Sequence, residues 1–226
     1  LDYCVVKIPR WPFDKFPSGD RMTGTQMKAT GEVMTIDRSF EAALQKAVRS
    51  LDLVRLSLMW EDKDWQTATD WKELPLFPPT DLRLWAILAA LRRGATPEEL
   101  SSYCYIDPWF LMAMARIQSM EKTIANSTII DAELLWESKR MGFSDECLAA
   151  LGIGDGREES VRKIRKDLGV KPVYKMVDTC AAEFEAATTY YYSTYEEENE
   201  AKPLVGPKAI VLGSGPIRIA QGIEFD

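Results

Sequence analysis

The stretch that decides the fold covers residues 96–117 and reads TPEELSSYCYIDPWFLMAMARI. It holds two strong signals for the start of a helix. Thr96 is followed by Pro97 and, three residues on, by Glu99, which is the pattern of a capping box with proline in the first helical position. Asp107 repeats the start signal, again before a proline, ahead of an apolar run. Because a good N-cap stabilises a helix by about 0.5–2 kcal/mol, this stretch predicts two consecutive helices.

Signals of the same kind extend outward over residues 80–169. Thr80 can cap a helix that runs to Arg93 and stops at Gly94, since glycine readily takes the left-handed conformation that follows a helix. The other expected helices have these caps and stops: Asp131 with Gly142, Ser144 with Gly152, and Asp155 with Glu158 before a helix from Ser160 to Leu168 that ends at Gly169. Six short helices with matching ends predict a compact helical module.

The residues before this module, up to about 52, have α+β composition. A strand is expected at residues 3–8, and the prolines at 9, 12 and 17 predict an irregular loop after it. A second strand is expected at 27–36 with a break at Gly31. Ser39 is expected to cap a helix with apolar residues at i, i+3, i+4 spacing, which predicts that one face of it is buried.

Two further segments flank the helices. Residues 53–79 form a proline-containing connector whose three tryptophans, at 60, 65 and 71, predict packing against a neighbouring domain. Residues 170–206 are irregular and β-like. Within them the run from Tyr190 to Tyr195 is read as a strand buried on both faces, with stacking on a ligand as the rarer alternative. The fold class predicted for the whole chain is mainly α: a multi-helix domain flanked by short α+β segments.

Composition limits the chemistry that this chain can perform. Its 226 residues are 46% hydrophobic and include no histidine. Ser-His-Asp and Cys-His nucleophile systems, the usual catalytic zinc sites and the two-His-one-carboxylate iron site are therefore excluded. The net charge of -7 lacks the basic footprint of a nucleic-acid-binding protein.

The four cysteines are far apart and include no C-x-x-C pair, which fits thiols in a reducing cytoplasm. No apolar run approaches the roughly 18 residues that span a bilayer, so no membrane partner is expected. The first residue is Leu1 rather than methionine, and both ends have strand-like patterns. We therefore expect this chain to be a fragment of a larger protein.

One loop near the end of the sequence is a candidate binding site. Gly213 and Gly215 follow a strand-like run and precede a helix-like segment, so the backbone amides between them can approach a phosphate or carboxylate. Pro216 departs from the dinucleotide-binding fingerprint, and a tight structural turn is the alternative.

The other patterns give weaker evidence of function. Residues 96–117 have the spacing of a helix-turn-helix, but Trp109, Phe110 and Met112 predict helix packing rather than base recognition. A basic cluster at 157–171 is read as a solvated helix face with carboxylate partners, and the run of glutamates at 196–200 as solvated rather than cation-binding. None of these patterns supplies a complete set of catalytic residues or a complete set of metal ligands.

Several strings together resemble one family, the large subunit of carbamoyl phosphate synthetase. They occur in the family's order along the chain and are KIPRW at 7–11, QMKATGEVM at 26–34, IDPWFL at 106–111, GFSD at 142–145, VYKMVDTCAAEF at 173–184, YSTYEEE at 192–198 and GSGPIRIAQGIEFD at 213–226. The connector at 53–79 matches least.

The resemblance implies a division of the chain into three parts: residues 1–55 as the end of the first ATP-grasp half, 56–205 as a helical oligomerisation domain with connectors, and 206–226 as the start of the second half. It implies a parent ligase that makes carbamoyl phosphate from bicarbonate, glutamine-derived ammonia and two ATP with Mg or Mn, for arginine or pyrimidine synthesis. It also implies a homo-oligomer and a small glutaminase subunit. The active sites of the family lie outside the matched strings, so this chain alone is expected to be inactive and to hold no cofactor.

The resemblance also suggests site residues. The candidates for lining the internal route of carbamate are Arg218, Gly222 and Glu224. A charged Arg–Glu pair can hold an anion, and glycine has no side chain that would narrow the channel. Ala220 stands where the family more often has glycine. The rival hypothesis is an autonomous anion- or nucleotide-binding module that uses the loop from Gly213 to Gly222.

Overall fold

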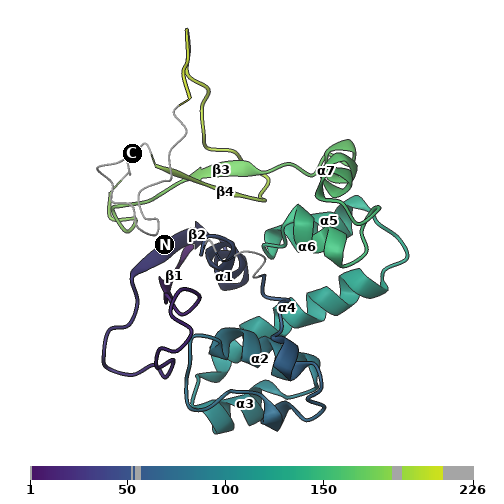
Figure 1. Cartoon of the computed structure of the whole chain (residues 1–226). Helices are drawn as coiled ribbons and strands as arrows, with labels where there is room; N and C mark the ends of the chain where they lie inside the picture. The colour runs from purple at the N-terminus through teal and green to yellow at the C-terminus, as the bar shows by residue number, and fades with distance from the viewer. Residues whose placement is uncertain (1, 52, 54–56, 185–189, 211–226) are drawn as a thin grey trace.

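The computed structural model describes residues 2–51, 53, 57–184 and 190–210, and it shows a mainly helical chain with two small sheets (Figure 1). The fold class predicted from the sequence is confirmed. The elements, in chain order, are β1 (Cys4–Arg10), β2 (Gly31–Asp37), α1 (Phe40–Arg49), the 3-10 turns η1 (Lys63–Trp65) and η2 (Trp71–Glu73), α2 (Arg83–Arg92), α3 (Pro97–Cys104), α4 (Pro108–Asn126), α5 (Ala132–Arg140), α6 (Asp145–Ala150), α7 (Glu158–Asp167), β3 (Val173–Met176) and β4 (Tyr191–Thr194).

The N-terminal unit pairs β1 and β2 in antiparallel fashion and packs α1 against them. The Ser39 hydroxyl accepts a hydrogen bond from the Ala42 amide, so the predicted cap of α1 is confirmed. Two strand boundaries were predicted wrongly. β1 continues through Pro9, which lies opposite Glu32 in a two-stranded ladder where a missing donor is tolerated at an edge. β2 begins at Gly31 instead of being interrupted there.

The helical module has the caps that the sequence predicts at four of its helices. Thr96 and Glu99 form a reciprocal capping box at α3, and Asp107, Asp131 and Ser144 each accept an amide hydrogen bond at the start of a helix. The predicted stops are also confirmed, because the glycines at 94, 142, 152 and 169 all have positive φ.

The caps at Thr80 and Asp155 are wrong as predicted. α2 begins at Arg83 after Leu82, and Thr80 instead accepts from the Leu82 amide in a local turn. α7 begins at Glu158, earlier than Ser160, and Asp155 accepts from the Arg157 amide outside the helix. In both places the short polar side chain bonds two residues ahead, which produces a turn rather than a cap.

The C-terminal segment forms a second antiparallel pair, β3 with β4. Burial alternates along β4, where Tyr192 is buried and Tyr191 is 45% exposed. The expectation of a strand buried on both faces is therefore wrong: among the described residues, burial alternates along both strands of this sheet, so that one face is covered and the other is exposed. In the part of the chain that the structure describes, no helix is long and apolar enough to cross a bilayer.

Candidate functional site

The residues that the sequence singles out for binding lie outside the described part of the chain. Gly213, Gly215, Arg218, Gly222 and Glu224 all fall within residues 211–226. Among the described residues there is also no group of three or more carboxylates and thiols that could hold a metal ion. The functional features that the structure does describe are exposed aromatic surfaces and the contacts that join the segments.

Exposed aromatic and other large apolar side chains are concentrated at the turn between α3 and α4. Five of them occur within ten residues of sequence, with exposed fractions from 41 to 83%: Tyr103, Tyr105, Trp109, Phe110 and Met112. The prediction that Trp109, Phe110 and Met112 are packed between helices is therefore only partly right. The core face of α4 is formed instead by Leu111, Met114 and Ile117, which are spaced three residues apart.

The first turn of α4 is fastened to the N-terminal unit through aromatic rings. Phe40, at the start of α1, lies 5.4 Å from the rings of both Trp109 and Phe110, edge to face in each case. Further along α4, Arg116 donates a hydrogen bond of 2.6 Å to Glu41. Edge-to-face pairs contribute about 0.5–1.5 kcal/mol each beyond buried area, so these contacts hold α1 and α4 in a fixed relation.

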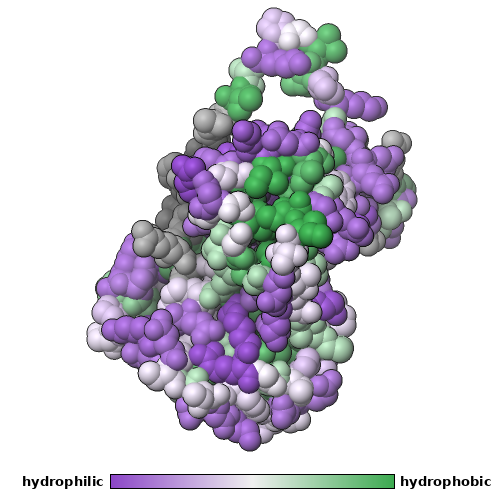
Figure 2. All heavy atoms as spheres, turned by 90° about the vertical axis from the view of Figure 1, so that its right-hand side faces the viewer, coloured by the Kyte–Doolittle hydropathy of each residue, from purple (hydrophilic) through white to green (hydrophobic). Residues whose placement is uncertain are grey.

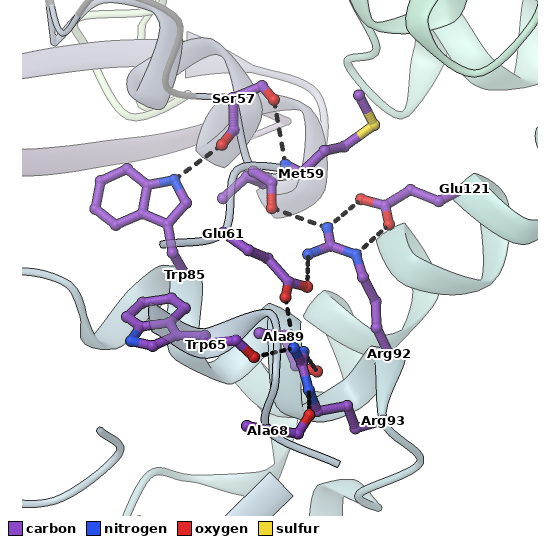
Figure 3. A network of polar contacts seen from close by, with 11 residues as sticks. Ser57, Met59, Glu61, Trp65, Ala68, Trp85, Ala89, Arg92, Arg93 and Glu121 are labelled. Carbon is purple, nitrogen blue, oxygen red and sulfur yellow. Dashed lines mark hydrogen bonds and ion pairs between the residues drawn. The ribbon is translucent and has the colours of Figure 1, made fainter. Parts of the chain in front are cut away.

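The described part of the connector from residue 57 onward packs onto α2. Figure 3 shows the guanidinium of Arg92 between carboxylates that come from the connector and from α4. It donates to both oxygens of Glu121 at 2.8 and 2.9 Å and to the Leu58 carbonyl at 2.9 Å. Glu61 completes the set from the connector, 3.4 Å from Arg92.

Arg93 and the tryptophans continue this attachment. Arg93 donates to the carbonyls of Trp65 and Ala68 and to Glu61, at 2.8 to 2.9 Å (Figure 3). Trp60 lies edge to face against Trp65 and against Trp85 of α2. The prediction that the tryptophans pack is confirmed, and the surfaces that they cover belong to this same chain: Trp85 of α2 for Trp60, and Tyr103 of α3 for Trp71. No sequence pattern indicates these roles of the two arginines, because their partners in the connector are 25 to 34 residues away along the chain.

A buried ion cluster joins α5, α6 and α7. Asp145 is 5% exposed and lies 3.0 Å from Lys139 and 2.8 Å from Arg165. Burial raises the pKa of the Asp145 carboxyl, but attraction by Lys139 and hydrogen bonding from Arg165 outweigh it, so that the pKa is lowered on balance. Burial also lowers the pKa of Lys139 and outweighs the attraction by Asp145, which raises it. The prediction of a solvated basic face is correct for Arg162 but wrong for Arg165.

The C-terminal strand β4 is tied to the helical module through the two residues that follow it. The Tyr195 ring lies 5.2 Å from the Lys139 ammonium and 6.3 Å from the Trp136 ring. Glu196 forms an ion pair of 3.0 Å with Arg140 on α5. The reading of the glutamates as merely solvated is therefore wrong for Glu196, and also for Glu200, which pairs with Lys175.

The same strand is tied to the N-terminal unit. Thr194 donates a buried hydrogen bond of 2.7 Å to Asp37 at the end of β2. Lys46 of α1 forms an ion pair of 2.6 Å with Asp37 and donates to the Ser193 carbonyl at 2.8 Å. We call these contacts of β4 and residues 195 and 196 the seam. The seam joins the N-terminal unit and β4 to the helices that lie between them in the chain.

A cavity of about 240 Å³ lies between the loop after β1 and the start of α2. Its arginines already have partners: Arg10 is bonded to both oxygens of Asp14, and Arg21 is paired with Asp81. The remaining wall is largely aromatic and aliphatic. Because both arginines are already paired with carboxylates, they are not free to bind an anion. We therefore do not expect an anion to bind more strongly in this cavity than it is hydrated in water.

The outer face at the right of Figure 1 is largely hydrophilic, with a large hydrophobic patch above its middle and smaller ones on the segment that projects at the top (Figure 2). Ile129, on the connection between α4 and α5, is 69% exposed. It is one of several exposed apolar side chains outside the α3–α4 turn.

Comparison with known proteins gives one family. Residues 32–169 match the family model described as the carbamoyl-phosphate synthetase large chain, oligomerisation domain. Among curated relatives, the carbamoyl phosphate synthase large chains of Thermomicrobium roseum, Caldanaerobacter subterraneus subsp. tengcongensis and Methanothermobacter thermautotrophicus are 61, 52 and 49% identical over the whole of this chain. The chain spans about a fifth of the length of these relatives. Since the family match runs from β2 to the turn after α7 and covers more than half of the residues, this chain belongs to the family of carbamoyl-phosphate synthetase large chain oligomerisation domains.

Proposed function

We propose that this chain is the oligomerisation and coupling region of a carbamoyl phosphate synthetase large chain, and that copies of it associate through the helical domain. We divide it at the boundaries suggested by the sequence: 1–55 as the end of a first synthetic half, 56–205 as the helical domain with its connectors, and 206–226 as the start of a second half. The family match and the names of the relatives support this proposal.

The observation that carries the coupling role is the seam. Asp37 receives a hydrogen bond from Thr194 and an ion pair from Lys46, while Tyr195 and Glu196 contact α5. Buried charges are costly to separate once they are paired. A displacement of the N-terminal unit is therefore transmitted to β4 instead of being absorbed between them.

The proposed activity belongs to the longer polypeptide. It is the ATP-dependent formation of carbamoyl phosphate from bicarbonate and glutamine-derived ammonia, with Mg or Mn as the metal, in the cytoplasm, for arginine or pyrimidine synthesis. A separate small glutaminase subunit supplies the ammonia. We assign no catalytic and no metal-binding residue to this chain, and we expect it to be inactive alone.

The proposed contribution to the internal route of carbamate rests on the resemblance of residues 213–226. Arg218, Gly222 and Glu224 are assigned to the lining of that route, and Gly213 and Gly215 to the turn that leads into it. An Arg–Glu pair provides a donor for an anionic intermediate and a carboxylate that orients the donor.

Light scattering on the purified 226-residue chain, from micromolar to millimolar concentration, tests the association. The expected result is a mass that rises above the 25.6 kDa of one chain as the concentration increases. A mass that stays at one chain at the highest concentration contradicts the proposal. Calorimetry with ATP tests the rival binding module: we expect no micromolar binding, and such binding would favour the rival.

A further inference from the structure

The cavity between the loop after β1 and the start of α2 lies where three segments of the chain meet. Its volume of about 240 Å³ equals that of about eight water molecules in the liquid. The residues that line it come from β1 and the loop after it, from the connector and from α2. The cavity therefore has room for a small molecule that contacts all three segments.

The charges in the wall of this cavity do not balance. Three aspartates and two arginines line it. Arg10 donates to both oxygens of Asp14 at 2.7 and 2.9 Å, and Arg21 donates to both oxygens of Asp81 at 2.5 and 2.8 Å. The third aspartate, Asp62, forms no ion pair in the part of the chain that the structure describes. One negative charge of the wall is therefore left without a counter-charge.

Asp62 is half-buried, and its carboxylate is held in place at the start of η1. Its Oδ1 atom accepts a hydrogen bond of 3.0 Å from the amide of Asp64. Among the described residues no donor is bonded to its Oδ2 atom. Hydrogen bonds between ionised groups are stronger than those between neutral ones. This oxygen is therefore a suitable acceptor for an N–H group that carries a positive charge.

Aromatic rings form much of the rest of the wall. Trp60 and Trp85 lie 6.1 Å apart with their ring planes at 85°, so they form a corner rather than a flat stack. The indole N–H of Trp85 donates to the Ser57 carbonyl at 2.9 Å (Figure 3), so its polar atom is already used. The Arg21 guanidinium lies 5.3 Å from the centroid of the Phe13 ring. Because aromatic rings attract cations, this wall favours a positive charge.

We propose that this cavity binds a small organic cation, a primary alkylammonium ion. Its ammonium group donates to Asp62, and its alkyl chain packs against Trp60 and Trp85. An anion does not fit, because both guanidinium groups are occupied by carboxylates, and a neutral molecule leaves the charge of Asp62 uncompensated. The bound ion contacts the loop after β1, the connector and α2 together, so it holds the N-terminal unit against the helical module. This site is independent of the association proposed above.

Calorimetric titration of the 226-residue chain with ligands of similar shape and different charge tests the inference. The ligands are n-butylammonium, n-butanol and butyrate, each at neutral pH. We expect submillimolar binding of n-butylammonium and dissociation constants at least tenfold higher for the other two. Equal affinities for n-butylammonium and n-butanol, or no binding of n-butylammonium at millimolar concentration, would overturn the inference.

Asp62→Asn tests the carboxylate, because it removes the charge but keeps an oxygen that can cap η1. We expect the dissociation constant of n-butylammonium to rise at least tenfold, and that of n-butanol to change by less than twofold. Asp70→Asn is the matched control. Asp70 begins η2 in the same way, by accepting from the Lys72 amide at 3.0 Å, and it does not line the cavity. A loss of affinity in both variants, or in neither, contradicts the role of Asp62.

Fluorine NMR of the chain labelled with 5-fluorotryptophan locates the bound ion. Single Trp→Phe variants assign the signals. We expect n-butylammonium to shift the signals of Trp60 and Trp85, and to leave that of Trp136, which packs against Tyr195 outside the cavity, unchanged. A larger shift at Trp136 than at Trp60 and Trp85 would place the ion elsewhere and overturn the inference. The proposed oligomerisation stands or falls separately, by light scattering.

Discussion

Gly142 lies against the backbone of α1. Its φ is +95°, and a Cβ atom there would lie 2.7 Å from Cα of Ala42 on α1. Gly142→Ala therefore adds backbone strain to a clash with another backbone. We expect the free energy of unfolding to fall by about 2–4 kcal/mol, measured by urea denaturation.

Gly94→Ala is the matched control. Gly94 has nearly the same φ, +91°, but no atom lies within 4 Å of the position that an added Cβ would take. Only the conformational cost of about 1–2 kcal/mol is expected. Equal losses in the two variants would contradict a close approach of α1 to the turn before α6.

Asp145 compensates two buried cations at once. Asp145→Asn leaves Lys139 and Arg165 buried without the carboxylate that both of them contact. Breaking a buried pair in this way costs about 3–5 kcal/mol, so we expect a loss of this size in the free energy of unfolding. The measurement is again urea denaturation at neutral pH.

Asp155→Asn is the control for this variant, because Asp155 pairs with Arg157 at an exposed turn. We expect no measurable change, since water replaces the partner at little cost. A loss comparable to that of Asp145→Asn would show that burial is not what makes the Asp145 cluster important.

At this scale, the residues whose roles are predictable from sequence are those with local partners. The Thr96 cap depends on an amide three residues away, so its pattern is visible in the sequence. The side-chain partners of Asp145 and Asp37 are 6 to 157 residues away, at positions that only the fold brings together. No local pattern distinguishes these aspartates from ones on the surface.

Among the elements, the connector is held by few but strong contacts. Arg92→Leu removes its bonds to Leu58 and Glu61 and leaves Glu121 buried without its partner on α2. We expect faster amide hydrogen exchange over 57–68, since these residues are attached to α2 mainly through Arg92, Arg93 and the tryptophans. Mass spectrometry of the exchanged peptides provides the readout.

Lys122→Leu serves as the comparison, because Lys122 is an exposed residue on α4. Its exchange profile should match that of the original chain. If Arg92→Leu leaves exchange over 57–68 unchanged, the aromatic packing of Trp60 and Trp65 is sufficient to hold the connector, and the role assigned to Arg92 is wrong.

Helices were predicted more reliably than strands and connections. Their stop signals are local, as the positive φ of Gly94 and Gly142 illustrates. The extent of β1 depended on the register with β2, which let the strand run through Pro9. The exposed face of β4 followed from the absence of a further described element over Tyr191, which its apolar sequence does not reveal.

For the whole molecule, the lack of histidine predicts a simple dependence of stability on pH. Hydrogen bonds from Arg10 and Lys28 lower the pKa of Asp14 and Asp20, respectively, below the ordinary value of 3.8, and the Lys139 and Arg165 cations lower that of Asp145 against its burial. A carboxyl with a lowered pKa in the folded state stabilises the fold above its unfolded pKa. This contribution is lost as the pH falls through the folded value.

We therefore expect the free energy of unfolding to be level between about pH 5 and pH 7 and to fall below about pH 4. Urea titrations at a series of pH values provide the measurement. A slope between pH 5 and pH 7 as steep as the slope below pH 4 would be inconsistent with these pKa shifts, because no histidine is present to produce it.

The family and the overall architecture were predictable from strings of sequence spread over the chain, whereas the candidate site was not. Which aromatic rings remain exposed depends on the fold: the sequence pattern predicted packing between helices for Trp109 and Phe110, which are 51 and 42% exposed. The residues proposed for the carbamate route stay a prediction, because they lie outside the described part of the chain.

The central claim is that this chain folds as one unit and associates with itself. The most direct test is the thermal unfolding midpoint of the original chain, measured by calorimetry over a hundredfold range of protein concentration. Association of folded chains stabilises them by mass action, so we predict a single transition whose midpoint rises with concentration. A midpoint that does not change over this range, or two separate transitions, would contradict the claim.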